Sequence, residues 1–288
     1  MPDSPDNLEL HLPYHPKDGE VMNAVDLLAA ESGLSRQKIK QAMKKGAVWV
    51  THGKLVRHLR RAKKPLSAGD TLHLYYNEAV LAEVPPEPVL IADEGSYSIW
   101  YKPYGLRSQG TKWADHCAIN RWLEQNMMPE RPAFIVHRLD RAATGLMIIA
   151  HTKAMAAAFS KMFRDRTITK RYRVVVHGEF SDSDTPTCLD GELDGKPSLS
   201  YVRRLAYDSE SDRSLLEVDI ETGRKHQIRR HLTDAGFPVV GDRLYGREGD
   251  EENMQLSAVE LVFTCPIDGA DTQYRIEAGR EGCPIAEL

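Results

Sequence analysis

The chain of 288 residues lacks the features that would place it in a membrane or in an oxidising compartment. It has no run of about 18 apolar residues, so we expect no membrane span. It does not open on a basic segment followed by an apolar core, so we expect no signal peptide. Its cysteines are far apart and form no CxxC pair. This pattern favours free thiols in a cytoplasmic protein without a zinc site, and a monomer is the default expectation.

Several catalytic signatures are also missing. The sequence contains neither of the glycine-rich patterns GxGxxG and GxxxxGK[ST] that cradle phosphates. It has no HExxH and no GxSxG either. The chain therefore carries no signal for nucleotide hydrolysis, zinc proteolysis or serine esterase chemistry.

Basic residues are segregated along a chain whose net charge is −4. Between Gly33 and Gly69 there are eleven Lys or Arg and no Asp or Glu, which leaves 27 basic against 42 acidic residues elsewhere. A solvated basic face is the ordinary explanation for a run of charge. Eleven cations without one anion instead favour a surface that binds RNA or DNA.

The segment with this basic run is predicted to form a small α+β domain over residues 16–80. Residues 1–15 are polar and contain three prolines, so we expect them to be disordered. Apolar spacing predicts a helix over 20–32, and Ser35 can cap a second helix that ends near Gly46. Strands are expected at 48–50, 55–56 and 71–75. Proline density then predicts a linker over 81–92.

The remainder, 93–288, is predicted to form a second domain. Helices are expected over 116–126 and 153–165, and apolar runs predict strands at 145–150, 174–176 and 215–218. Strands outnumber helices and do not alternate with them regularly. This favours an α+β fold with a mixed, largely antiparallel sheet and flanking helices.

Three polar clusters in the second domain are candidates for chemistry: 137–140 (His-Arg-Leu-Asp), 170–172 (Lys-Arg-Tyr) and 223–231. Each has a non-functional interpretation when taken singly. Asp140 could pair with Arg138 for structure, Tyr172 could be a core residue, and His137 could simply pack. The cluster 223–231 could be a solvated face.

Together the clusters resemble the RluA-type pseudouridine synthase family. The family pattern HRLDxxTSGL is matched at 137–146, KxY at 170–172 and GRxHQIRxHL at 223–232. GxPxxGDxxYG is matched at 236–246 and KPxGL at 102–106. The chain departs from the family by having Ala143-Thr144 for Thr-Ser and Ala142 for Asp.

The first domain resembles the S-four-type RNA-binding module, which is common at the N-terminus of this family. The matching residues are 35–38, 46–50 and 53–54, with His52 where the module usually has Asn. Arg36, Lys40 and Lys44 recur every four residues and would form one outward basic stripe. The residues expected to contact RNA are Arg36, Lys38, Lys40, Lys44, Lys45 and Lys54.

The family resemblance implies isomerisation of uridine to pseudouridine within RNA, without a cofactor or metal. Asp140 would be the essential carboxylate, either attacking C1′ or removing a proton from C2′. Arg229 would pair with Asp140 and favour its ionised form. Tyr172 would stack on the uracil and assist removal of the C5 proton.

The resemblance also implies substrate contacts around a flipped-out uridine. Arg138 would fill the space that the base vacates. The other residues expected to bind substrate are His137, Lys170, Arg224, His226, Gln227 and Leu256. The RNA is expected to be large-subunit (23S) ribosomal RNA, with transfer RNA as the alternative.

Two rival functions remain at this point. The first is a non-catalytic RNA-binding or ribosome-assembly factor that keeps the fold. The second is a metal-dependent nuclease that uses His137, Asp140, His226 and His231, although no carboxylate cluster for magnesium accompanies them.

Overall fold

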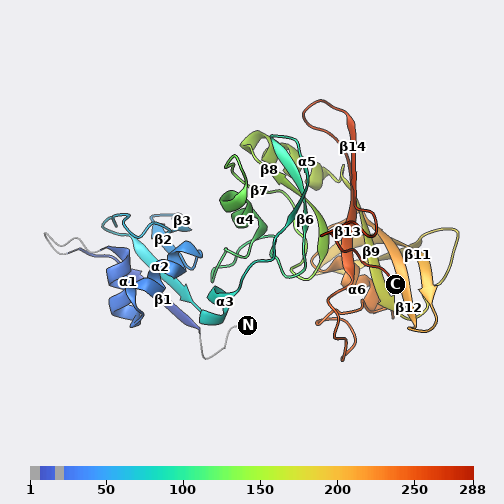
Figure 1. Ribbon diagram of the computed structural model, residues 1–288, viewed down its shortest axis with the longest axis horizontal. Helices are drawn as coiled ribbons and strands as arrows, with labels where there is room; N and C mark the ends of the chain where they lie inside the picture. The colour runs from blue at the N-terminus through green and yellow to red at the C-terminus, as the bar shows by residue number, and fades with distance from the viewer. Residues whose placement is uncertain (1–6, 17–22) are drawn as a thin grey trace. The chain divides into compact units, whose positions relative to one another are not determined.

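The computed structural model describes residues 7–16 and 23–288. The chain divides into two compact units, one comprising 1–85 with 109–122 and the other 86–108 with 123–288. Both mix helices with sheets, so the predicted α+β class is confirmed (Figure 1). Over the described ranges, no helix is long and apolar enough to cross a membrane.

The first unit contains one antiparallel sheet with the strand order β1-β4-β2-β3. Its strands are β1 (Leu8–Pro13), β2 (Val48–His52), β3 (Leu55–His58) and β4 (Thr71–Tyr76). One face packs against the helices through apolar side chains that alternate along the strands, as a half-buried sheet requires. These include Val48, Val50, Leu72 and Leu74.

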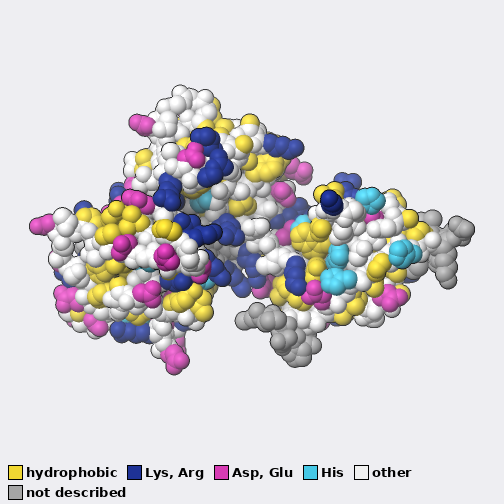
Figure 2. Space-filling model, turned by 180° about the vertical axis from the view of Figure 1, so that it is seen from behind, with side chains coloured by type: hydrophobic (Ala, Val, Ile, Leu, Met, Phe, Trp, Pro, Cys, Tyr) yellow, Lys and Arg dark blue, Asp and Glu magenta, His cyan; other side chains and the backbone are white. Residues whose placement is uncertain are grey.

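The helices described wholly within this unit are α1 (Ala24–Ser32), α2 (Arg36–Lys44) and α3 (Glu78–Ala82). The predicted cap is confirmed, because Ser35 Oγ accepts a hydrogen bond from the Lys38 N–H. Ile39 and Met43 on α2 are fully buried. Histidine side chains lie on the surface of the same unit, cyan in Figure 2.

Two predictions at the start of the chain need correction. Residues 8–13 are not disordered: Leu8, Leu10 and Leu12 alternate with polar residues, and the strand pairs with β4. The flanking prolines obscured this two-residue period. Residues 1–6 of the predicted disordered segment and 20–22 of the predicted first helix lie outside the described residues.

The predicted linker 81–92 is also too long. Helix α3 reaches Ala82, and β5 (Val89–Asp93) already pairs with the next strand. Only 83–88 lies outside helices and strands. In addition, 109–122 groups with the first unit, where Ala114 is buried in the core and Asp115 forms an ion pair with Arg60. Such a long-range contact leaves no local signal in the sequence.

The second unit is built on a ten-stranded sheet with the order β10-β11-β12-β9-β13-β8-β6-β5 along its main path. β14 pairs with β13, and β7 pairs with β8. The strands are β5, β6 (Tyr97–Lys102), β7 (Phe134–Ile135), β8 (Thr144–Ala150), β9 (Thr169–His177), β10 (Thr187–Leu193), β11 (Lys196–Asp208), β12 (Arg213–Ile220), β13 (Leu256–Thr264) and β14 (Asp271–Arg275). Among the described residues only β8 and β13 pair in parallel, so the mixed, largely antiparallel sheet is confirmed.

The remaining helices are α4 (Ile119–Asn126), α5 (Lys153–Asp165) and α6 (Gln227–Asp234). Helix α5 lies against β8, and its Phe159 is fully buried among Tyr97, Leu146 and Phe263. Helix α5 therefore covers the part of the sheet formed by β6, β8 and β13. The strand β8, buried along its whole length, is therefore a rigid base for the residues that precede it.

The parallel contact between β8 and β13 depends on Gly145. Its φ is +110°, and it lies opposite Ala258. A Cβ atom at this position would come within 2.5 Å of the Ala258 nitrogen. Only glycine allows both this backbone conformation and this close approach.

We therefore expect Gly145→Ala to lower the free energy of unfolding by about 2–4 kcal/mol, because overpacking adds to backbone strain. Gly191→Ala is the matched control, since Gly191 is a strand glycine at which an added Cβ atom would meet no other atom within 4 Å. It should change stability by less than about 0.5 kcal/mol. Denaturant unfolding followed by circular dichroism measures both variants. Equal stabilities would contradict the steric argument.

Candidate active site

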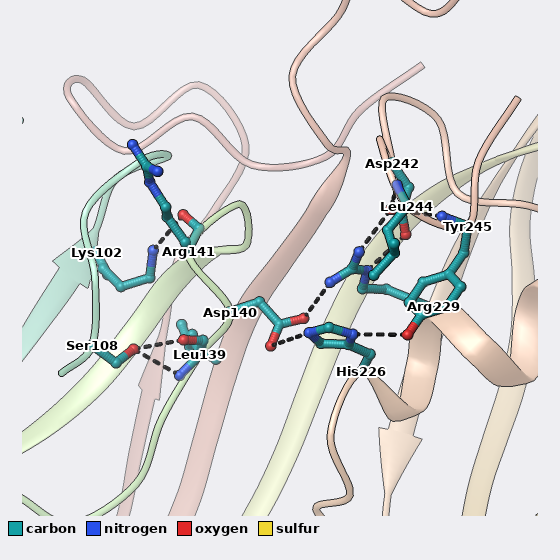
Figure 3. Close-up of polar contacts among 10 residues, drawn as sticks. All are labelled: Lys102, Ser108, Leu139, Asp140, Arg141, His226, Arg229, Asp242, Leu244 and Tyr245. Atoms are coloured by element: carbon teal, nitrogen blue, oxygen red, sulfur yellow. Dashed lines mark hydrogen bonds and ion pairs between the residues drawn. The ribbon is translucent and has the colours of Figure 1, made fainter. Parts of the chain in front are cut away.

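Asp140 lies in the segment between β7 and β8, beside the centre of the large sheet. Strand β13 is the parallel neighbour of β8, and β9 is the next strand along. Tyr172 comes from β9, and Arg229 comes from helix α6. Figure 3 shows Asp140 beside Arg229 and His226, two clusters that are far apart in the sequence. Tyr172 of the third cluster is near enough for the charge of Asp140 to raise its pKa.

The guanidinium of Arg229 joins two carboxylates. Its Nη1 donates to Asp140 Oδ2 at 2.9 Å. Its Nε and Nη2 donate to the two oxygens of Asp242 at 2.6 and 2.7 Å. The predicted pairing of Arg229 with Asp140 is therefore present, and Asp242 completes it from the opposite side (Figure 3).

The two carboxylates differ in their surroundings. The Asp242 side chain is fully buried, and its Oδ1 also accepts hydrogen bonds from the backbone of Leu244 and Tyr245. The Asp140 side chain is 28% exposed. Asp242 is thus fixed inside the protein, whereas Asp140 can meet a substrate.

Burial and neighbouring charges have opposite effects on the pKa values of Asp242 and Arg229. Burial by itself would raise the pKa of Asp242, but the hydrogen bonds from Arg229, Leu244 and Tyr245, together with the charge of Arg229, lower the pKa. Burial would lower the pKa of Arg229, but Asp242 and Asp140 together raise it. Both groups therefore stay charged at neutral pH.

His226 lies on the other side of Asp140. Its Nδ1 is 3.0 Å from the Tyr245 hydroxyl, and its Nε2 is 3.8 Å from Asp140 Oδ1. The second distance is too long for a hydrogen bond, so the structure leaves Oδ1 without a close partner there. Burial lowers the pKa of His226, and the nearby Asp140 only partly opposes this.

The backbone beside Asp140 is held by two residues, one at the end of β6 and one in the segment after it. Ser108 Oγ accepts from the Leu139 N–H at 3.0 Å and donates to the Leu139 carbonyl at 2.7 Å. The fully buried Lys102 Nζ donates to the carbonyls of Pro103, Leu106 and Arg141. Burial lowers the pKa of Lys102 to about 7. These bonds fix the loop on both sides of Asp140.

Tyr172 and Leu256 lie on neighbouring strands and are both buried. Burial raises the pKa of the Tyr172 hydroxyl, and the charge of Asp140 raises it further. The hydroxyl is therefore un-ionised at neutral pH. Asp140 is close enough to Tyr172 for this electrostatic effect.

His137 and Lys170 meet around Phe163 on α5. The His137 ring stacks on Phe163 with centroids 4.4 Å apart, and its Nε2 accepts from the Ile148 N–H at 2.9 Å. Burial, with Lys170 nearby, lowers the pKa of His137 to about 3, so the ring is neutral. Lys170 Nζ lies 6.0 Å above the Phe163 ring. The contacts seen for His137 are thus packing and support of β8.

The other residues expected to bind substrate differ in exposure and in how many partners their side chains already have. Arg138 is exposed and forms no ion pair with any residue that the structure describes. Arg224 is partly buried, and its Nε donates to the Pro197 carbonyl. Gln227 is buried, and its amide bonds with Thr222, Arg224, Leu199 and Ser200. Gln227 therefore supports the start of α6.

Asp242, Tyr245, Ser108 and Lys102 were not among the predicted site residues. Asp242 and Tyr245 stand in the GDxxYG part of a motif that the sequence already showed, and Lys102 opens KPxGL. These two motifs were the sequence features from which Asp242, Tyr245 and Lys102 could have been predicted as site residues. Ser108 lies just after KPxGL, and only its position in space connects it with Leu139.

The residues of the nuclease hypothesis do not form a ligand set. Nowhere in 7–16 or 23–288 do three or more His, Cys, Asp or Glu side chains converge as a metal site would require. His231 is instead hydrogen-bonded to Ser198 and Ser200.

The basic residues of the first unit divide into two groups. Arg36 pairs with Asp26 at 2.6 Å, Lys38 pairs with Glu78 at 3.1 Å, and Lys45 donates to the Leu81 carbonyl. Lys40, Lys44 and Lys54 are exposed and form no ion pair with described residues. The predicted stripe on α2 therefore contains two unpaired cations rather than three.

Comparison with known proteins shows the family of this chain. The family model described as RNA pseudouridylate synthase matches residues 96–234. An uncharacterized RNA pseudouridine synthase from Synechocystis is 32% identical over 75% of both chains. One from Aquifex aeolicus is 30% identical over 87% of this chain and 88% of its own. This chain belongs to the RluA-type RNA pseudouridine synthases.

The pseudouridine synthase is accordingly an isomerase, as its motifs predicted. Its fold agrees with a solved structure, human RNA pseudouridylate synthase domain containing 1. That structure has a TM-score of 0.56 and 21% identity, and the match covers 68% of this chain and 86% of the human one. At this identity the likeness supports the fold alone.

The synthase should depend on the forked shape of Arg229, because a lysine ammonium cannot reproduce the two parallel bonds to Asp242 in the same geometry while also reaching Asp140. We expect Arg229→Lys to reduce kcat by about 100-fold or more, with the fold retained. Arg230→Lys on the same helix is the control, since Arg230 forms only an exposed pair with Asp194. Single-turnover assays of pseudouridine formation measure both. Equal activity would show that positive charge alone suffices.

Proposed function

We propose that this pseudouridine synthase modifies uridines in large-subunit ribosomal RNA, with Asp140 as its catalytic carboxylate. The observation that carries the role of Asp140 is the shared arginine: Oδ2 is held by Arg229, whereas among the described residues Oδ1 has only His226 Nε2 nearby, at 3.8 Å. A carboxylate oriented at one oxygen and open at the other is suited to react with a sugar carbon or its proton.

Relatives support ribosomal RNA as the target class. A protein of Neisseria meningitidis, named ribosomal large subunit pseudouridine synthase D, is 28% identical over 83% of this chain and 71% of its own. A Vibrio parahaemolyticus protein named dual-specificity RNA pseudouridine synthase RluA is 32% identical over 57% of this chain. Transfer RNA remains the alternative substrate. The enzyme would act in the cytoplasm as a monomer, with its cysteines as free thiols.

In the proposed reaction the N1–C1′ bond breaks, the uracil rotates, and a C5–C1′ bond forms. Asp140 Oδ1 either bonds to C1′ until the base has turned, or takes the C2′ proton and later returns it. The proton on C5 is lost after the new bond forms, and N1 gains one. Neither route changes the overall composition, so no cofactor is consumed.

Tyr172 would act chiefly through its ring. Its raised pKa leaves the hydroxyl protonated, which disfavours it as a base for the C5 proton. A buried ring next to Leu256 instead offers an apolar surface against which a flipped uracil can stack. Exposed Arg138 is free to occupy the gap left in the RNA.

The first unit would increase the affinity of the enzyme for RNA by acting as an S-four-type RNA-binding domain. Its unpaired Lys40, Lys44 and Lys54 can contact phosphates, which position RNA without reading its sequence. The ion-paired Arg36 and Lys38, and Lys45 with its carbonyl partner, would contribute less.

Asp140→Asn tests the proposed chemistry. The amide has the shape of the carboxylate but can neither attack C1′ nor accept the proton, so pseudouridine formation should fall by at least about 10²–10⁴-fold. RNA binding should be retained. Asp194→Asn, an exposed aspartate that pairs with Arg230, is the control and should keep full activity.

Mapping pseudouridines across cellular RNA, with and without the gene, identifies the substrate. Sites lost only from transfer RNA would replace the ribosomal proposal. No lost site in any RNA would leave the non-catalytic assembly factor as the better explanation.

Lys40→Gln with Lys44→Gln tests the basic stripe. Loss of two phosphate contacts should weaken RNA binding and reduce the slope of log affinity against log salt by about 1.4. Arg36→Gln with Lys38→Gln removes the same charge from paired positions and should change the slope less. Fluorescence anisotropy at several salt concentrations gives both slopes. Equal changes would contradict the distinction between paired and unpaired cations.

A further inference from the structure

A line of rings crosses the face of the small sheet that is turned away from its helices. His11 on β1 is in register with His73 on β4, His73 with Trp49 on β2, and Trp49 with His58 on β3. Each of the four strands therefore contributes one ring to the same row. The alternate residues of β2 and β4 face the core, so this side of the sheet is a separate surface.

The rings of this row contact one another. Trp49 and His58 have centroids 3.6 Å apart, and His11 packs edge-on to His73 at 5.0 Å. The Nδ1 atoms of His11 and His73 are hydrogen-bonded at 2.7 Å. The row is thus a connected surface rather than a set of isolated side chains.

The segment 109–122, which belongs to the same unit, extends the row. Tyr75 lies edge-on to both His11 and Trp113, with centroids 5.8 Å apart in each case. Lys112 lies over the rings of Tyr75 and Trp113 at 4.8 and 5.3 Å, and also pairs with Glu9. We call these six rings, with Lys112, the ring platform.

The ring platform is accessible. The His11 side chain is 49% exposed and that of His58 is 25% exposed, while Trp49, His73, Tyr75 and Trp113 are partly exposed. Exposed histidines are visible on this unit in Figure 2. The platform is not part of the hydrophobic core, which contains the inward residues of the same strands.

We propose that the ring platform binds unpaired nucleotides of the substrate RNA by stacking on their bases. Rings on a sheet surface, accompanied by a cation, are the chemistry that single-stranded nucleic acids require, because every base offers a flat face. The choice of RNA as the ligand rests on the proposed function. The platform itself contains none of the residues of the candidate active site.

Charge and composition favour RNA over a protein partner. The platform stands on the unit that holds eleven Lys or Arg and no Asp or Glu between Gly33 and Gly69, which attracts a polyanion. The row across the strands contains no aliphatic side chain, and three of its four members are histidines. A duplex keeps its bases stacked inside, so the ligand is a single-stranded segment.

The test compares the full-length protein with the double variant His11→Ala, Trp113→Ala. The probes are oligouridine, which is unstructured, and a blunt-ended RNA duplex of equal strand length. Oligouridine binding should weaken at least about tenfold, because two stacking surfaces are lost. Duplex binding should be unchanged. Leu55→Ala, at an exposed position outside the platform, is the control and should bind both probes normally.

The variant His11→Phe, Trp113→Phe separates stacking from other roles. It keeps both rings but loses the imidazole and indole N–H groups, so it should restore oligouridine binding. Thermal unfolding of each variant shows whether the unit remains folded. Unchanged oligouridine affinity in the alanine variant, failure of the phenylalanine variant to rescue, or platform-dependent self-association would each overturn the proposal.

These outcomes are independent of catalysis. Loss of platform binding together with intact pseudouridine formation on a short substrate would support the platform as a separate binding site. Wild-type protein that binds oligouridine through the platform but forms no pseudouridine would contradict the proposed function alone.

Discussion

The active site depends on one guanidinium shared by two carboxylates. Asp242 is fully buried and already accepts two backbone N–H groups, so its position is fixed. Arg229 is then held through Nε and Nη2, and its Nη1 can only point towards Asp140. A buried charge pair is costly unless every group is satisfied, and here the backbone satisfies it. The consequence is an Asp140 that is oriented without being enclosed.

The remaining parts of the site serve that orientation. Ser108 bonds the N–H and the carbonyl of Leu139, and Lys102 donates to the Arg141 carbonyl. Gly145 lets β8 approach β13 closely, and β13 pairs with β9, the strand of Tyr172. Each of these contacts joins segments that are far apart in the sequence. The backbone is therefore held by hydrogen bonds at the residues on both sides of Asp140.

Local patterns allowed four helices, the Ser35 cap and the three polar clusters to be predicted, whereas α3 and α6 were missed. The helix over 153–165 and the Ser35 cap follow from short-range spacing, and both are confirmed. The pairing of Arg229 with Asp140 came from family motifs. Asp242 and Ser108 were missed because their roles arise only when distant segments meet. The strand Leu8–Pro13 was missed because nearby prolines outweighed a short two-residue alternation.

The charge distribution explains how a chain with a net charge of −4 can act on a polyanion. At physiological salt, charges interact over only about 8 Å, so each cluster acts locally and the net charge matters little. Lys40 and Lys44 are free to meet phosphates, whereas Arg229 is committed to two carboxylates. In the proposed function, affinity for RNA and reactivity towards uridine therefore depend on different cations. Arg138 is exposed and two residues from Asp140, so we expect it to be the cation that contacts RNA next to the proposed catalytic carboxylate.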